Sequence, residues 1–188
     1  MRVRWTLVSQ VAQKVLQDSP EAVQASGFVD PYALAKKNGI EVRESALDDS
    51  LSGFLIRNDD GQVFIGVNAS NGTARKRFTV AHELGHYFLH DRMSAYIDEY
   101  AGRFKVMTRD EVSTEGTDVR EIEANRFAAE LLMPEQSIRR DIEHHGHVDL
   151  FNEDDDPDSV IKTLADRYGV SVRAMTIRLE RLGYVSEI

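Results

Sequence analysis

Residues 77–89 have the sequence RFTVAHELGHYFL, and this stretch decides the fold. Its apolar side chains fall on almost every side of a helix, which indicates a helix buried in the core of the protein. The pattern extends over residues 74–91, and Asn71 and Gly72 interrupt the chain just before it. We therefore expect a central helix over residues 74–91 and place the rest of the chain around it.

The pattern H-E-x-x-H occupies residues 82–86, in the middle of this helix. At about 3.6 residues per turn, His82 and His86 point the same way one turn apart, so both imidazoles can reach a single zinc ion. Glu83 is rotated by about 100° from His82, and there it can accept a proton from a zinc-activated water without binding the metal. Burying two imidazoles and a carboxylate is costly unless a partner satisfies them, so we favour a metal site over a hydrogen-bonded core pair.

A catalytic zinc needs a third protein ligand and an open fourth position. His90 lies eight residues after His82. This spacing is about 12 Å along the helix axis, which is too far for both residues to share one tetrahedron. The longer pattern with a later Gly and a third His also fails, because Leu89 and Arg92 stand at those positions. We expect His90 to cap or pack the helix end instead.

Carboxylates of a second helical segment, residues 120–133, are better candidates for the third ligand. Glu121 and Asn125 share one stripe with small residues, a face that another helix can approach closely. Glu123 falls with Arg126 on a stripe that we expect to be more solvated. We therefore favour Glu121 as the ligand and keep Glu123 as the alternative. Asn125 would then hold a ligating His through its second ring nitrogen.

The remaining patterns indicate a small sheet and several further helices. Short β-type runs occupy residues 40–43, 53–57 and 63–67, and residues 58–61 predict a hairpin turn between the last two runs. We expect a small, mostly antiparallel three-stranded sheet, with residues 63–67 as a candidate edge for pairing with an extended substrate. The predicted fold class is α+β: mostly helical and zincin-like, with a C-terminal helix-turn-helix-like helix pair.

The sequence favours a division of the chain into four parts. They are an N-terminal helical segment at residues 1–29, a metallopeptidase core at 30–150, an acidic loop at 151–158 and the helix-turn-helix-like subdomain at 159–188. Asp30 and Pro31 supply an N-cap and a first-turn proline for a short helix. The stretch 138–158 is polar and contains His144, His145 and His147, so we expect a loop there.

Composition excludes several classes of protein. The chain has 188 residues with 23 basic and 32 acidic side chains, and its net charge of −9 disfavours non-specific binding of nucleic acid. Cys is absent, so a transition-metal site must use His and carboxylates. The lack of Cys, of a signal-peptide core and of a run of about 18 apolar residues leads us to expect a cytoplasmic protein.

Two blocks of sequence, taken in order, closely resemble the ImmA/IrrE family of bacterial metallopeptidases. They are RFTVAHELGH at residues 77–86 and E-x-E-A-N-x-F-A-A-x-L-L-M-P at residues 121–134. The resemblance implies a gluzincin-like set of functional residues: zinc ligation by His82, His86 and Glu121, with Glu83 as the catalytic carboxylate. It also implies an anti-repressor function, since members of the family cut, or act on, small helix-turn-helix (XRE-type) repressors or antitoxin-like partners.

The resulting prediction is a zinc endopeptidase. Glu83 would take a proton from the attacking water and return it to the leaving amine. Tyr87, Tyr96 and Tyr100 are candidate donors to the oxyanion, and no spacing argument selects among them.

Two functions from other classes stay open. The C-terminal residues 161–182 carry five basic and two acidic side chains. The protein could therefore be a transcription factor in which zinc is structural and the helix pair binds DNA through Arg173 or Arg178. Against this, the molecule is acidic as a whole, and the resemblance suggests that the pair packs on the peptidase. The other possibility is a protein that sequesters its repressor without cutting it.

Overall fold

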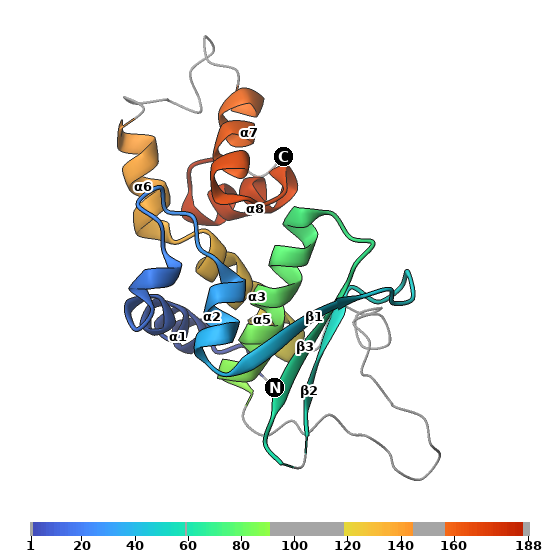
Figure 1. Ribbon diagram of the computed structural model, residues 1–188. Coiled ribbons are helices and arrows are strands. Elements are labelled where there is room, and N and C mark those ends of the chain that lie inside the picture. Colours follow the sequence, from blue (N-terminus) through green and yellow to red (C-terminus); the bar gives the residue numbers. More distant parts are fainter. Residues whose placement is uncertain (1, 59, 91–118, 145–156, 186–188) are drawn as a thin grey trace.

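The computed structural model describes residues 2–58, 60–90, 119–144 and 157–185 (Figure 1). These ranges are mostly helical with one small sheet, which confirms the predicted α+β class. The elements are, in chain order, α1 (Trp5–Gln17), η1 (Pro20–Ala22), α2 (Pro31–Lys37), β1 (Ile40–Ser45), β2 (Gly53–Arg57), β3 (Val63–Asn68), α3 (Thr73–Leu89), α5 (Val119–Leu132), α6 (Glu135–His144), α7 (Pro157–Tyr168) and α8 (Val172–Leu182). None of the helices in the described ranges combines the length and hydrophobicity that a bilayer span requires.

The sheet has the strand order β1-β3-β2 and is mixed. β2 pairs with β3 in the antiparallel sense, with Gly53 opposite Val67, which confirms the predicted hairpin. β1 pairs with β3 in parallel, with Ile40 opposite Val63, so the expectation of a mostly antiparallel sheet is wrong for one of the two pairings. The candidate edge at residues 63–67 is also wrong, because β3 has a neighbour on each side and the described edges are β1 and β2.

A buried asparagine accounts for the position of β1. The side-chain amide of Asn68, at the end of β3, donates to the carbonyls of Asp48 at 3.1 Å and Leu51 at 3.0 Å. These bonds hold the connection between β1 and β2 against the end of β3. β1 can then lie on the far side of β3 instead of pairing with β2. The short-range sequence pattern predicts the strands but not this long-range choice of partner.

The predicted helix starts agree with the local sequence signals. Asp30 caps α2, since its carboxylate accepts the backbone amides of Tyr32 at 2.9 Å and Ala33 at 3.3 Å. Pro31 occupies the first turn, as expected. The two helices that carry the candidate ligands, α3 and α5, begin and end within two residues of the predicted bounds.

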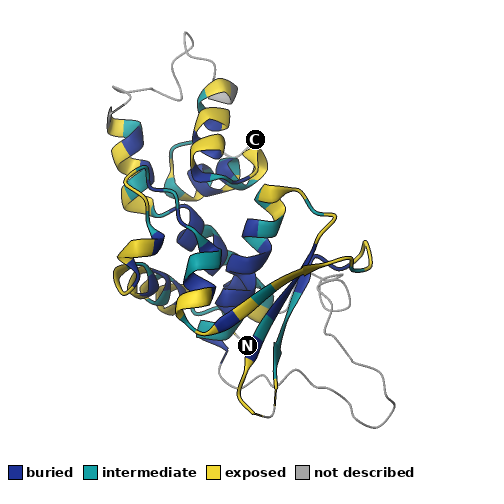
Figure 2. Ribbon diagram, viewed as in Figure 1, coloured by how far each residue is buried: buried dark blue, intermediate teal, exposed yellow. Residues whose placement is uncertain are grey.

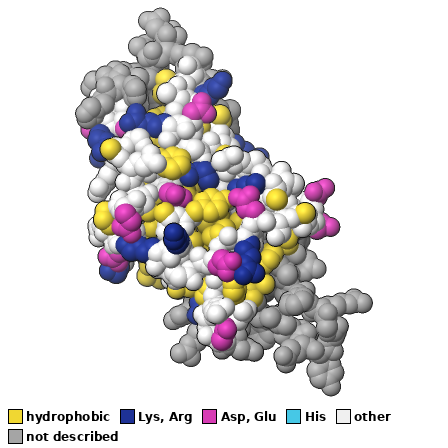
Figure 3. All heavy atoms as spheres, in the orientation of Figure 1, with side chains coloured by type: hydrophobic (Ala, Val, Ile, Leu, Met, Phe, Trp, Pro, Cys, Tyr) yellow, Lys and Arg dark blue, Asp and Glu magenta, His cyan; other side chains and the backbone are white. Residues whose placement is uncertain are grey.

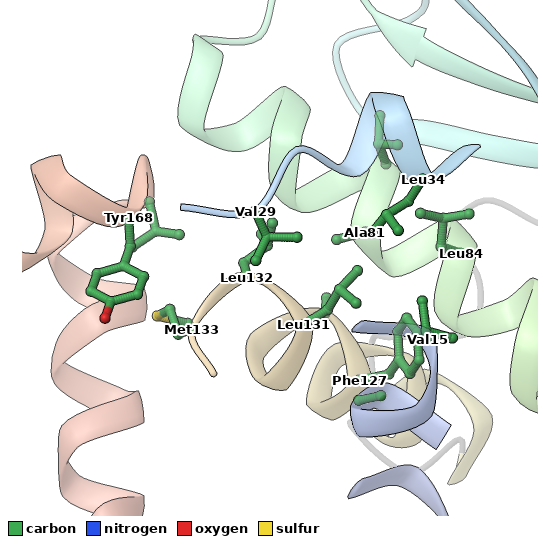
Figure 4. Packing of buried hydrophobic residues seen from close by; sticks show 14 of the residues in the cluster. Val15, Val29, Leu34, Ala81, Leu84, Phe127, Leu131, Leu132, Met133 and Tyr168 are labelled. Atoms are coloured by element: carbon green, nitrogen blue, oxygen red, sulfur yellow. The ribbon is translucent and has the colours of Figure 1, made fainter. Parts of the chain in front are cut away.

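One hydrophobic cluster runs through the described helices and the sheet. Figure 4 shows it extending from Val15 of α1, past Phe127 and Leu131 of α5, to Tyr168 of α7. The central turns of α3 are dark blue in Figure 2, whereas α1, α6 and α7 each carry an exposed outer face. The helix with the H-E-x-x-H pattern is therefore held on several sides by packed core, as the sequence predicts.

The C-terminal helices α7 and α8 pack on this core through two buried arginines. Arg77 of α3 donates to the carbonyls of Val29 at 2.8 Å and Gly169 at 3.0 Å. Arg178 of α8 donates to the carbonyl of Met133 at 3.1 Å and is only 3% exposed. The suggestion that Arg178 contacts DNA is therefore wrong, because its guanidinium faces the interior of the protein.

Part of the predicted polar loop is a helix. α6 covers residues up to His144, and its inner face carries Ile138, which is fully buried, and Asp141, which is 4% exposed. Asp141 accepts a hydrogen bond of 2.8 Å from the phenol of Tyr168. The polar composition led to the wrong prediction because only a narrow face of this helix is buried. The rest of the loop, with His145, His147 and most of the acidic run, lies outside the described residues.

Candidate metal centre

A glycine allows the two ligand-bearing helices to approach each other closely. A Cβ atom on Gly85 of α3 would lie 3.0 Å from the Cα of Ala124 in α5 and 3.2 Å from the ring of Phe127. Only a residue without a side chain fits this crossing without moving the neighbouring helix. The close approach brings the first turn of α5 over the middle of α3, where His82 and His86 lie.

Two imidazoles and one carboxylate meet at this crossing. The Nε2 atom of His82 lies 3.1 Å from Oε2 of Glu121, and the Nε2 atom of His86 lies 3.0 Å from Oε1 of the same residue. The two Nε2 atoms lie 3.0 Å from each other. One ligand atom from each of the three residues can be chosen so that all lie within 4.8 Å of one another. This group could hold a metal ion, and a set of two nitrogens and one oxygen suits zinc.

The histidines set the charge state of Glu121. Burial alone would raise the pKa of this carboxyl group, but hydrogen bonds from His82 and His86 outweigh burial and hold the pKa well below its usual range. Glu121 is therefore ionised at neutral pH and presents a negative charge to the two rings. An ionised carboxylate is the form that binds a cation.

An amide contacts the ring of His82 on the side away from Glu121. The Oδ1 atom of Asn125 lies 3.1 Å from Nδ1 of His82. An amide oxygen only accepts hydrogen bonds, so this contact favours a proton on Nδ1 of His82, and a metal ion would then take the lone pair of Nε2. The Nε2 atom is the ring nitrogen that faces Glu121.

Glu123, the alternative third ligand, lies in a different environment. Its side chain is 1% exposed, so the expectation of a solvated stripe is wrong. Arg4, at the start of α1, covers it with hydrogen bonds to the carboxylate from the backbone N at 2.7 Å and from Nη2 at 2.6 Å. These contacts, the side-chain bond first, lower the pKa of Glu123 to about 2. The carboxylate of Glu123 is thus engaged by a cation from the protein itself.

His90 links this carboxylate to the candidate ligands. Its Nε2 atom lies 3.1 Å from Oε2 of Glu123, and its Nδ1 atom lies 3.0 Å from Nδ1 of His86. Its backbone also forms the C-cap of α3, which confirms the expectation that His90 caps or packs the helix end. Burial lowers the pKa of the His90 imidazole. Arg4 is the member of this group that no local sequence pattern indicates, because it lies 119 positions from Glu123 in the chain.

The remaining candidates are placed as follows. Glu83 is 8% exposed and follows His82 in the helix, where its burial removes competing water. The ring centroid of Tyr87 lies 5.0 Å from the ring centroid of Phe88 and 5.6 Å from the guanidinium carbon of Arg57. Tyr96 and Tyr100 lie outside the described residues.

A buried H-E-x-x-H helix is crossed by a second helix that brings Glu121 to its two histidines, and these three residues could hold a metal ion. The sequence profile of the IrrE N-terminal-like domain, Peptidase_M78, matches residues 35–180, and the chain belongs to this family. Membership supports a metallopeptidase-type regulatory function.

Two further proteins show what the chain is similar to. A protein of Bacillus phage phi105 named "uncharacterized immunity region protein 2" is 29% identical over 131 residues, which are 70% of this chain and 71% of the phage protein. The solved structure of a Mycobacterium tuberculosis transcriptional regulator superposes with a TM-score of 0.58 at 20% identity and covers 91% of this chain. The chain spans about half of that regulator, 47% of its length, and the likeness concerns the fold alone.

Proposed function

We propose that the protein is a zinc-dependent endopeptidase that cuts a helix-turn-helix repressor or an antitoxin-like regulator. The observation that carries this proposal is the convergence of the Nε2 atoms of His82 and His86 on the carboxylate of Glu121. Three donors from two separate segments, all facing one point, are the ligand set of a catalytic zinc site with one open position. In this proposal Glu123 is not a ligand, because Arg4 and His90 already engage its carboxylate.

His82, His86 and Glu121 would hold the ion, and Asn125 would fix the ring of His82. A zinc ion in this site supplies Lewis acidity, which acidifies a nearby water and polarises a peptide carbonyl. In the metal-bound protein the Asn125 oxygen would hold a proton on Nδ1 of His82, which would leave Nε2 to donate its lone pair to the ion.

Glu83 is the proposed general base and general acid. It follows His82 directly, and a carboxylate at this position of the helix lies beside the ligands rather than among them. Its burial favours proton transfer, because little water competes for the carboxylate. It takes the proton of the attacking water and then gives it to the leaving amine of the cleaved peptide.

The proposed substrate class rests on the family and on the names of the similar proteins. One is an immunity region protein of a phage and the other is a transcriptional regulator. A protease of this kind would act on the repressor that prevents expression of the genes in such an immunity region. Direct reading of DNA has less support, because Arg178 is buried and the face drawn in Figure 3 intersperses basic with acidic side chains.

Incubation of the purified protein and zinc with the helix-turn-helix repressor encoded beside its gene tests the proposal by fragment masses. The parent protein should produce two fragments, and Glu83→Gln should bind zinc equally well and produce none. Glu130→Gln is a matched control, since it removes another buried carboxylate, whose described partners are Ser9, Arg126 and Arg178 rather than the candidate ligands. An intact repressor with changed affinity for its operator would identify a sequestering protein and contradict the proposed cleavage.

A further inference from the structure

We propose that His90, Glu123 and Arg4 form a hydrogen-bonded chain that orients His86 and fixes which of its ring nitrogens offers a lone pair to the metal. These three are positioning residues, because they act through His86 and do not touch the substrate. The inference rests on the proposed function only in requiring that the protein binds a metal at His86.

The contacts of the chain are continuous from the surface to the ligand. Arg4 donates from its backbone N, Nε and Nη2 to the carboxylate of Glu123. Glu123 in turn lies 3.1 Å from Nε2 of His90, and Nδ1 of His90 lies 3.0 Å from Nδ1 of His86. The side chains of His90 and Glu123 are 4% and 1% exposed, so water does not compete for these bonds.

The direction of each bond follows from the acceptor at its end. A carboxylate held by an arginine only accepts, so the Nε2 atom of His90 carries a proton and donates it to Glu123. In a neutral imidazole the other nitrogen then accepts, which makes Nδ1 of His90 the acceptor for Nδ1–H of His86. With its proton on Nδ1, His86 would offer a bound metal ion the lone pair of Nε2. This is the atom that lies 3.0 Å from Glu121.

The chain gives the two histidine ligands different supports. The Nδ1 atom of His82 contacts the amide of Asn125, which lies on the same helix as Glu121. His86 is held by a relay that ends on the N-terminal segment, because Arg4 precedes α1 directly. The packing of the N-terminal segment on α5 is therefore coupled to the orientation of His86.

Metal affinity measured by competition with a chromophoric chelator tests this chain apart from activity. His90→Phe keeps a ring in place but removes both nitrogens, and zinc should bind about 10–100-fold more weakly. The visible absorption of bound Co²⁺ should change as well, because the His86 ring is free to turn. His90→Gln should restore most of the affinity, since its amide oxygen can accept from His86 and its NH₂ group can donate to Glu123.

The control is Glu130→Gln, which removes a different buried carboxylate of α5 that also pairs with an arginine and an α1 side chain, Arg126 and Ser9. It should leave the zinc affinity and the Co²⁺ spectrum unchanged. If His90→Phe binds zinc as tightly as the parent protein with the same Co²⁺ spectrum, the inference is overturned. Equal weakening in Glu130→Gln would also overturn it, since the effect would then reflect general loss of packing.

A second variant covers the case in which His90→Phe does not fold. Arg4→Met changes a side chain that is 38% exposed and should weaken zinc binding a few-fold, whereas an unchanged affinity would overturn the inference. The zinc-affinity measurements can succeed or fail independently of the cleavage test of the proposed function. A parent protein that binds zinc but leaves every repressor intact would fail the cleavage test, while the affinity series would still decide the role of His90.

Discussion

Gly85 of α3 lies directly against Ala124 of α5, so close that a Cβ atom at position 85 would stand 3.0 Å from the Ala124 Cα atom. This contact is the point at which the two helices cross. Glu121 is about one turn from Ala124, and the separation of the helices decides whether its carboxylate reaches the histidines. The absence of a side chain at position 85 therefore helps to bring the candidate ligands of the two helices together.

Gly85→Ser should separate the helices and damage both stability and metal binding. Forcing a side chain into a packed crossing costs about 1–3 kcal/mol, which urea denaturation of the metal-free protein would measure. Zinc affinity should fall in the same variant. The matched control is Gly72→Ser at the N-cap of the same helix, where nothing lies within 4 Å of a Cβ and serine is a favoured residue. Equal stability of the two variants would contradict the account of the crossing.

Arg77→Met should loosen the C-terminal helices from the body of the protein. The guanidinium donates to the carbonyls of Val29 and Gly169, one buried and one partly buried, and methionine would leave both oxygens without this donor. We expect a loss of about 2–4 kcal/mol in the free energy of unfolding. Arg75→Met is the control on the same helix, because Arg75 is exposed and bonds only the Ser52 hydroxyl among its described partners. A cost under about 1 kcal/mol for Arg77→Met would show that this arginine does not anchor the pair.

The buried phenol of Tyr168 should make the free energy of unfolding fall at alkaline pH. Burial, and then the hydrogen bond to Asp141, raise the pKa of this phenol above its ordinary value. The unfolded chain ionises near pH 10, so it loses a proton there while the folded protein keeps its own. The contribution of Tyr168 is thus complete below about pH 10 and is lost as the pH rises from there toward the raised pKa.

Tyr168→Phe isolates this contribution. At pH 7 the variant should lose about 1 kcal/mol, the usual worth of one hydrogen bond, and Arg167 still pairs with Asp141 at 3.0 Å. Between pH 9 and pH 11 its stability should fall less steeply than that of the parent protein, as followed by urea denaturation at each pH. Parallel pH profiles for the two proteins would exclude a protonated, buried phenol as the cause.

Local signals in the sequence predict most of the fold around the candidate site. Three signals each involve residues close together in the sequence: the apolar side chains around α3, the Asp30 cap and the hairpin turn. The structure has these features where the patterns predict them. The parallel pairing of β1 depends on hydrogen bonds from Asn68 to the segment between β1 and β2. One of these bonds goes to the carbonyl of Asp48, which lies 20 positions earlier in the chain. No local pattern reports such a contact.

The environment of Glu123 shows the same limit within the site. Its helical stripe carries Arg126 and Glu130, which indicated a solvated face. In the structure α1 covers that stripe, and Arg4 and Ser9 pair with its carboxylates. Polar partners contributed by a distant segment turn a charged stripe into a buried one, and only the tertiary fold reveals them.

Zinc-edge anomalous diffraction from crystals of the zinc-loaded protein tests the central claim most directly. We predict one strong anomalous peak about 2.1 Å from the Nε2 atoms of His82 and His86 and from a carboxylate oxygen of Glu121. Glu123 should remain bonded to Arg4 and His90. A peak coordinated by Glu123 in place of Glu121, or no peak between the two histidines, would contradict the proposed metal centre.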